Sequence, residues 1–131
     1  MIRLIIISMA ILILSTSIVN AEQKVKITGT FSDLYYNEEG GDLLGNEIRI
    51  VVGRDGYEGT FQASEGAPDR LILIKPIQVT GNEIKFSIPE NSLYAGDFVG
   101  KISETELTGT LTLKNGNKIK MILKRGKSYW D

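Results

Sequence analysis

The sequence predicts an all-β domain, an eight-stranded antiparallel meander that curls into a small closed or nearly closed β-barrel. Apolar side chains recur at every second position through most of the chain, and no segment has the 3.6-residue period of a helix. Short turn-forming segments separate the alternating stretches. All 14 glycines follow residue 28, as suits a tightly curved sheet. A two-layer β-sandwich is the alternative, although the short connections favour the barrel.

The first 21 residues are predicted to be a secretory signal peptide. Arg3 precedes an apolar run from Leu4 to Leu14, and Val19-Asn20-Ala21 matches a small-x-small cleavage site. The run is shorter than the roughly 18 apolar residues that a membrane-spanning helix needs. Residues 22–131 are therefore expected to form a single β-barrel domain, secreted or periplasmic, with no membrane span after cleavage.

The first three strands each rest on two-residue alternation. Residues 24–31 place valine, isoleucine, glycine and phenylalanine alternately with lysine and threonine. A polar stretch over residues 33–46 breaks the pattern and is predicted to be a long loop. Residues 47–52 and 57–63 resume the alternation on either side of the turn Arg54-Asp55-Gly56.

The fourth strand, expected over residues 70–79, is apolar on both faces in its first half. If the alternation runs unbroken, its odd-numbered residues point inward. Ile72 and Ile74 then lie on an outer face that a loop or a partner subunit covers. Pro76 cannot donate to a ladder and predicts a bulge, a bend or a strand edge. An unbroken register buries Lys75 as a candidate anion contact, whereas a bulge returns it to solvent.

The last four strands are expected over residues 83–88, 96–102, 107–113 and 118–124, all with clear alternation. Asn115-Gly116, the strongest short hairpin signal in the chain, joins the final two. These strands form a meander with one apolar face that must be buried.

Four segments share the form large apolar, any residue, glycine, polar, large apolar. They are centred on Gly29, Gly59, Gly100 and Gly109. An inward glycine between two large residues lets a neighbouring side chain pack over the strand, as a small curved barrel requires.

The pattern resembles the calycin-type barrels, which include avidins and lipocalins. Gly29-Thr30-Phe31 in the first strand, the eight-strand meander and Trp130 near the closing end carry the resemblance. An avidin-like pocket uses several tryptophans and this chain has one, while a lipocalin first strand reads Gly-x-Trp where this chain has phenylalanine. The resemblance therefore implies the architecture and identifies no ligand.

Composition excludes several kinds of chemistry. The chain has no histidine and no cysteine, which excludes histidine-based triads, cysteine nucleophiles and disulfides. Its net charge of −1 gives no electrostatic footprint for nucleic acid. The acidic stretch at residues 37–42 does not fit a calcium loop. No catalytic residue, metal or cofactor is predicted.

The candidate binding residues are aromatic. Tyr35, Tyr36 and Trp130 are expected to meet at the open end of the barrel. The inward aromatics either line a lumen for a small apolar ligand or fill the barrel as core; they are Tyr57, Phe61, Phe86 and Phe98.

The expected function is that of a non-enzymatic exported β-barrel that binds a small apolar molecule at its mouth. A protein interaction or inhibitor module is the alternative, with Ile72 and Ile74 as the interface to a protein partner or a second copy. A third hypothesis is a hydrolase. It would need two carboxylates, which could come from Glu47, Glu58, Glu65 or Asp97.

Overall fold

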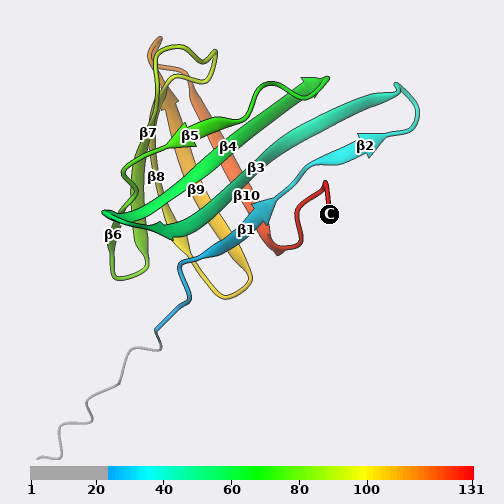
Figure 1. The fold of residues 1–131 in the computed structure, drawn as a ribbon. Helices are drawn as coiled ribbons and strands as arrows, with labels where there is room; N and C mark the ends of the chain where they lie inside the picture. Colours follow the sequence, from blue (N-terminus) through cyan, green and yellow to red (C-terminus); the bar gives the residue numbers. More distant parts are fainter. Residues whose placement is uncertain (1–23) are drawn as a thin grey trace, which may run out of the picture.

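The computed structural model describes residues 24–131, which form one ten-stranded antiparallel sheet and contain no helix. The sheet curls into a half-barrel (Figure 1), so the prediction of an all-β, barrel-like fold is confirmed. The predicted signal peptide lies outside the described residues. Within residues 24–131 no helix is long and apolar enough to cross a membrane.

The strands follow one another closely along the chain. They are β1 (Gly29–Ser32), β2 (Tyr35–Asn37), β3 (Asp42–Gly53), β4 (Gly56–Gly66), β5 (Ile72–Ile74), β6 (Gln78–Thr80), β7 (Glu83–Ile88), β8 (Gly96–Ile102), β9 (Glu106–Leu113) and β10 (Lys118–Gly126).

The first and last strands of the chain, β1 and β10, lie side by side within the sheet. The two edge strands, β5 and β6, come from the middle of the sequence. The order of the sheet is β5-β4-β3-β1-β10-β9-β8-β7-β6, with β2 paired to β3. Phe31 of β1 faces Ile48 of β3 on one side and Arg125 of β10 on the other. The two ends of this order, β5 and β6, are joined only by residues 75–77.

The prediction of eight strands is wrong in two places. Residues 33–46, expected to be a loop, instead form β2 and the first part of β3, paired through Tyr35 and Leu44. Residues 70–79, expected to be one strand, form β5 and β6 with a break at the cis Lys75–Pro76 peptide bond. Tyr35-Tyr36 and Leu43-Leu44 are pairs of adjacent large residues that do not alternate, which is why the two-residue period misses this hairpin.

The expected facing of the fourth strand is also wrong. Ile72 and Ile74 are 7% and 0% exposed, whereas Leu71 and Leu73 are each 61% exposed. The pairing of Ile72 with Phe61 and of Ile74 with Gly59 sets which side points inward. The break at Pro76 then shifts the alternation by one residue, so that Ile77 is buried as well. Lys75 lies on the same side of the strand as Leu71 and Leu73 and is exposed with them.

Aromatic and branched aliphatic side chains fill the concave face. Phe31, Phe61 and Phe98 are 0 to 1% exposed, and the Phe86 and Phe98 rings stack with their centres 4.7 Å apart. Gly100 and Gly109 are register partners beside the Phe98 ring, where a Cβ atom would collide with it. The inward glycines therefore make room for a large ring in a strongly curved sheet.

Candidate ligand sites on the half-barrel

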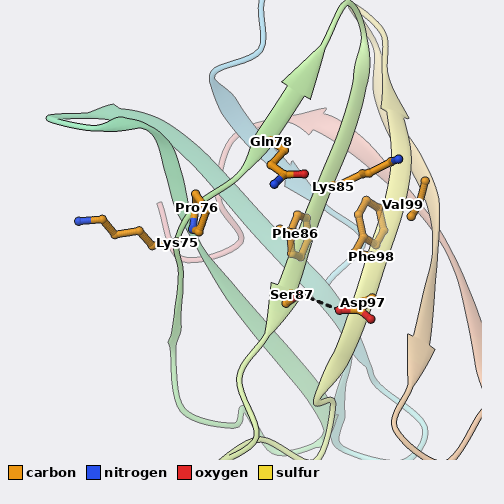
Figure 2. Close-up of a pocket in the computed structure, with 9 residues that line it drawn as sticks. All are labelled: Lys75, Pro76, Gln78, Lys85, Phe86, Ser87, Asp97, Phe98 and Val99. Carbon is orange, nitrogen blue, oxygen red and sulfur yellow. Dashed lines mark hydrogen bonds between the residues drawn. The ribbon is translucent and has the colours of Figure 1, made fainter.

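One depression lies at the seam where β5 and β6 fail to close the sheet (Figure 2). Its volume is about 320 Å³, and its lining includes Pro76 and Gln78 on one side and Ser87 and Asp97 on the other. Phe86 and Phe98 form its floor but are almost fully buried. Little aromatic surface is therefore available there to a ligand.

Several polar groups of this seam already have partners. Lys75 Nζ lies 3.8 Å from Asp55 and 3.7 Å from Glu58, and in Figure 2 its side chain points away from the depression. The Ser87 hydroxyl donates a hydrogen bond of 2.6 Å to Asp97. Because these charged groups already have partners, we expect the seam to bind a charged ligand only weakly.

A larger cleft of about 840 Å³ lies at one end of the half-barrel. Its walls come from the segment before β1, the start of β4 and the β6–β7 turn; the lining residues are Lys24, Val25, Ile27, Tyr57, Val79, Thr80, Gly81 and Asn82. This volume falls in the range of about 300–1,000 Å³ that is usual for small-molecule sites.

Hydrogen bonds from three other parts of the chain hold these walls in place. The Ile77 amide donates to the Tyr57 carbonyl at 2.9 Å, and the Ile102 amide donates to the Asn82 carbonyl at 2.8 Å. Arg125 donates to the Thr28 carbonyl at 2.8 Å and so fixes the segment before β1. Backbone hydrogen bonds therefore hold the β4 wall and the β6–β7 turn, whereas the Arg125 side chain holds the segment before β1.

The cleft has an apolar body and a polar rim. Val25, Tyr57 and Val79 are half-buried and pack against the core, so part of each apolar surface faces the cleft. Lys24 is exposed at its edge, and Thr80 and Asn82 add hydrogen-bonding groups. Such a surface suits a molecule with an apolar part and an anionic or polar end.

The structure separates the aromatic residues that the sequence singles out. Tyr57 lines the end cleft, and Phe86 and Phe98 lie under the seam. Phe61 is in the core, where its ring meets that of Tyr94 edge-on at 5.8 Å. Tyr35 and Tyr36 are exposed on β2. Val25 and Val79 are missed as site residues, although the alternation places both of them inward.

Trp130 belongs to a C-terminal tail that lies on the convex face of β3 and β4. Its indole N–H donates to Gln62 Oε1 at 2.8 Å, and the Tyr129 amide donates to Glu47 at 2.9 Å. Gln62 pairs with Glu47, whereas Tyr35 pairs with Leu44, three residues along β3. That offset corresponds to about 10 Å along a strand.

The candidate carboxylates of a hydrolase each have a different partner. Glu47 accepts from Ser128, Glu58 pairs with Lys75, Glu65 accepts from Tyr94, and Asp97 accepts from Ser87. No group of three or more acidic residues suited to a metal ion occurs in the part of the chain that the structure describes.

No protein-family model matches the chain, and neither a curated protein nor a solved structure matches it. The shape and chemistry of the end cleft are therefore the best guide to function.

Proposed function

We propose that the protein is a non-enzymatic exported binding protein that holds a small amphipathic molecule in the cleft at the end of the half-barrel. The observation that carries the proposal is the cleft itself, of about 840 Å³, with Val25, Tyr57 and Val79 on its walls. The signal-peptide pattern before residue 22 supports export. The resemblance to calycin-type barrels through Gly29-Thr30-Phe31 agrees with it at the level of architecture.

The class of ligand follows from the apolar body and the polar rim of the cleft. An apolar chain placed against the valines and the Tyr57 ring gains about 25 cal/mol for each Å² removed from water. Lys24, at the edge of the cleft, attracts a negatively charged head group. A medium-chain carboxylate combines both features and is the class that we expect to bind.

The experiment titrates the chain from residue 22 with decanoate and with the neutral matched probe decanol, followed by isothermal calorimetry and amide NMR shifts. We expect shifts centred on Val25, Tyr57 and Val79. Val79→Asp should weaken both ligands at least tenfold, because it places a charge on the apolar wall. Lys24→Gln should weaken decanoate and leave decanol unchanged.

Leu93→Asp serves as the matched control, since Leu93 is 89% exposed and lies away from the cleft. An affinity for decanoate that is unchanged in Val79→Asp, or amide shifts that cluster outside the cleft, would contradict the proposal.

A second candidate is an interaction module that uses the free edge at β5. Leu71 and Leu73 are exposed there, in place of the expected Ile72 and Ile74, and exposed apolar side chains on an edge strand favour a partner. The test compares the wild type with Leu71→Asp/Leu73→Asp by chemical crosslinking in host cells. Identical crosslinks in the two would rule this candidate out.

A further inference from the structure

Charge is unevenly divided between the two halves of the sheet. Residues 33–69, which include β2, β3 and β4, contain nine acidic and two basic residues, whereas residues 97–127, which include β8, β9 and β10, contain three acidic and seven basic ones. The near-neutral total therefore conceals one acidic and one basic region. Complementary potentials of this kind steer association between proteins.

The basic region contains a groove of about 390 Å³ on the convex face of β8, β9 and β10. Short Thr108 and Thr110 side chains on β9 form its floor. Glu83 of β7, whose carboxylate pairs with Lys85, lies at the edge of the groove beside Lys101. The walls are longer side chains on the two strands that flank β9; they are Val99 and Lys101 on β8 and Lys120 and Ile122 on β10. We call these four residues and the two threonines the basic groove.

The register alternates charge and apolar surface across this groove. Thr108 lies between Lys101 and Ile122, and Thr110 lies between Val99 and Lys120. Each lysine therefore faces an apolar side chain across the floor. Val99 and Ile122 are 47% and 62% exposed, which leaves apolar surface beside each positive charge.

The acidic region ends in the β2–β3 hairpin, which projects from the half-barrel (Figure 1). Glu38, Glu39 and Asp42 are exposed around its tip, and Tyr35 and Tyr36 are exposed on β2 just before it. The tip thus presents negative charge beside aromatic surface. The basic groove presents positive charge beside the aliphatic surface of Val99 and Ile122.

The charges at both places are free within residues 24–131. The four ion pairs in this part of the chain join other residues: Lys75 to Asp55 and Glu58, Lys85 to Glu83, and Lys114 to Glu90. The acidic tip and the groove lysines are thus available to an external partner.

We infer that the β2–β3 hairpin of one copy docks in the basic groove of a second copy. Glu38 and Glu39 pair with Lys101 and Lys120, while the tyrosines cover Val99 and Ile122. The groove walls are two strand spacings apart, about 9.6 Å, and the two strands of the hairpin are about 4.8 Å apart. Because the side chains of the walls occupy part of this distance, the space over the threonines admits side chains of the hairpin tip rather than its two strands.

This contact joins two different surfaces, so it is head-to-tail. A copy that inserts its hairpin into a neighbour still has its own groove free. A further copy can bind in that groove, so the assembly can grow. The inference does not depend on ligand binding in the end cleft.

The test measures weight-average mass against concentration by sedimentation, for the wild type and two charge-reversed variants. The wild type should self-associate at about 0.01 M salt and dissociate at about 1 M, where the Debye length falls from about 30 Å to about 3 Å. Lys101→Glu/Lys120→Glu and Glu38→Lys/Glu39→Lys should each remain monomeric. An equimolar mixture of the two should associate again, because the intact hairpin of one variant meets the intact groove of the other, and the reversed hairpin and the reversed groove also carry opposite charges.

The control is Lys26→Glu/Lys127→Glu, which changes the net charge equally at exposed positions outside the groove. It should associate like the wild type. A wild type that stays monomeric at low salt, or a mixture of the two variants that stays monomeric, would overturn the inference. A monomeric wild type that binds heparin through Lys101 and Lys120 would assign the groove to a polyanion instead.

Discussion

The guanidinium carbon of Arg125 lies 4.6 Å from the centre of the Phe31 ring, and the two residues are register partners across β10 and β1. The same guanidinium donates to the carbonyls of Thr28 at 2.8 Å and Ser103 at 3.0 Å, and also to that of Lys26. One side chain therefore fastens the segment before β1 and the β8–β9 turn to the last strand.

Replacing Arg125 with alanine should lower the free energy of unfolding by about 2–4 kcal/mol, because it removes a cation–π contact and hydrogen bonds to partly buried carbonyls. Arg125→Lys should recover part of this loss, since lysine keeps the charge but cannot hold several carbonyls in one plane. Urea denaturation measures both. Arg54→Ala, in the exposed β3–β4 turn, is the control and should cost less than about 0.5 kcal/mol. Equal losses in Arg125→Ala and Arg54→Ala would contradict this role.

Gly109 should not tolerate a side chain. A Cβ atom there would lie 2.6 Å from the Val99 carbonyl oxygen and closer still to the Phe98 ring. Gly109→Ala is expected to cost about 1–3 kcal/mol through overpacking. Gly126→Ala, where an added Cβ has no neighbour within 4 Å, is the matched control and should be nearly neutral.

A double-mutant cycle tests the cause of that loss. In a Phe98→Leu background the Gly109→Ala penalty should shrink by at least about 0.5 kcal/mol, as expected for side chains in contact. An unchanged penalty would mean that backbone crowding at Val99, and not the ring, excludes the side chain.

Tyr94 should make stability fall at high pH. Burial, followed by the hydrogen bond that Tyr94 donates to Glu65, raises the pKa of the Tyr94 hydroxyl above its usual range. The folded chain then keeps a proton that the unfolded chain loses near pH 10. The contribution is complete below about pH 10 and decreases as the pH rises further, because the folded state binds more protons.

The measurement compares urea denaturation of the wild type and Tyr94→Phe between about pH 9 and pH 11. The wild type should lose stability more steeply than Tyr94→Phe, which has no hydroxyl to ionise. Tyr35→Phe, at an exposed position, should follow the wild type. Parallel curves for the wild type and Tyr94→Phe would count against the pKa shift.

Glu47 should anchor the C-terminal tail. It is 8% exposed and accepts hydrogen bonds from the Ser128 hydroxyl and the Tyr129 amide. Glu47→Ala should release the tail and cost about 1–3 kcal/mol, because two hydrogen bonds to a charged group are lost. Trp130 is the only tryptophan, so its fluorescence should become more accessible to acrylamide quenching.

Glu58→Gln is the control for this change, since Glu58 also lies on the convex face but pairs with Lys75. Quenching should remain as in the wild type. Unchanged quenching in Glu47→Ala would show that the tail is held by other contacts, such as the bond from Trp130 to Gln62.

Most of the sheet could be predicted from local pattern. Alternation places Phe61, Phe86, Phe98 and Leu111 inside, and all four are buried. The Asn115-Gly116 signal marks the hairpin between β9 and β10, where Gly116 has a φ of 87°. In these segments one face is apolar and the other polar, so only one register buries the apolar side.

The candidate site was less predictable. Tyr57 reaches the end cleft, but Phe61 is core, and Trp130 is held on the convex face by Gln62. Whether an inward side chain lines a cleft or fills the core depends on which distant strands pass over it. Alternation within one strand carries no information about that.

By itself, the sequence determined the fold class, most strand positions and the inward glycines, because each depends on residues that are neighbours along the chain. Only the tertiary structure decided which side of residues 71–74 is buried, since both sides are apolar and pairing with Phe61 and Gly59 makes the choice. It also decided that β1 lies beside β10, that the tail covers Glu47 and that acidic and basic strands occupy different parts of the sheet. These features arise from contacts between residues far apart in the chain, which a two-residue period does not encode.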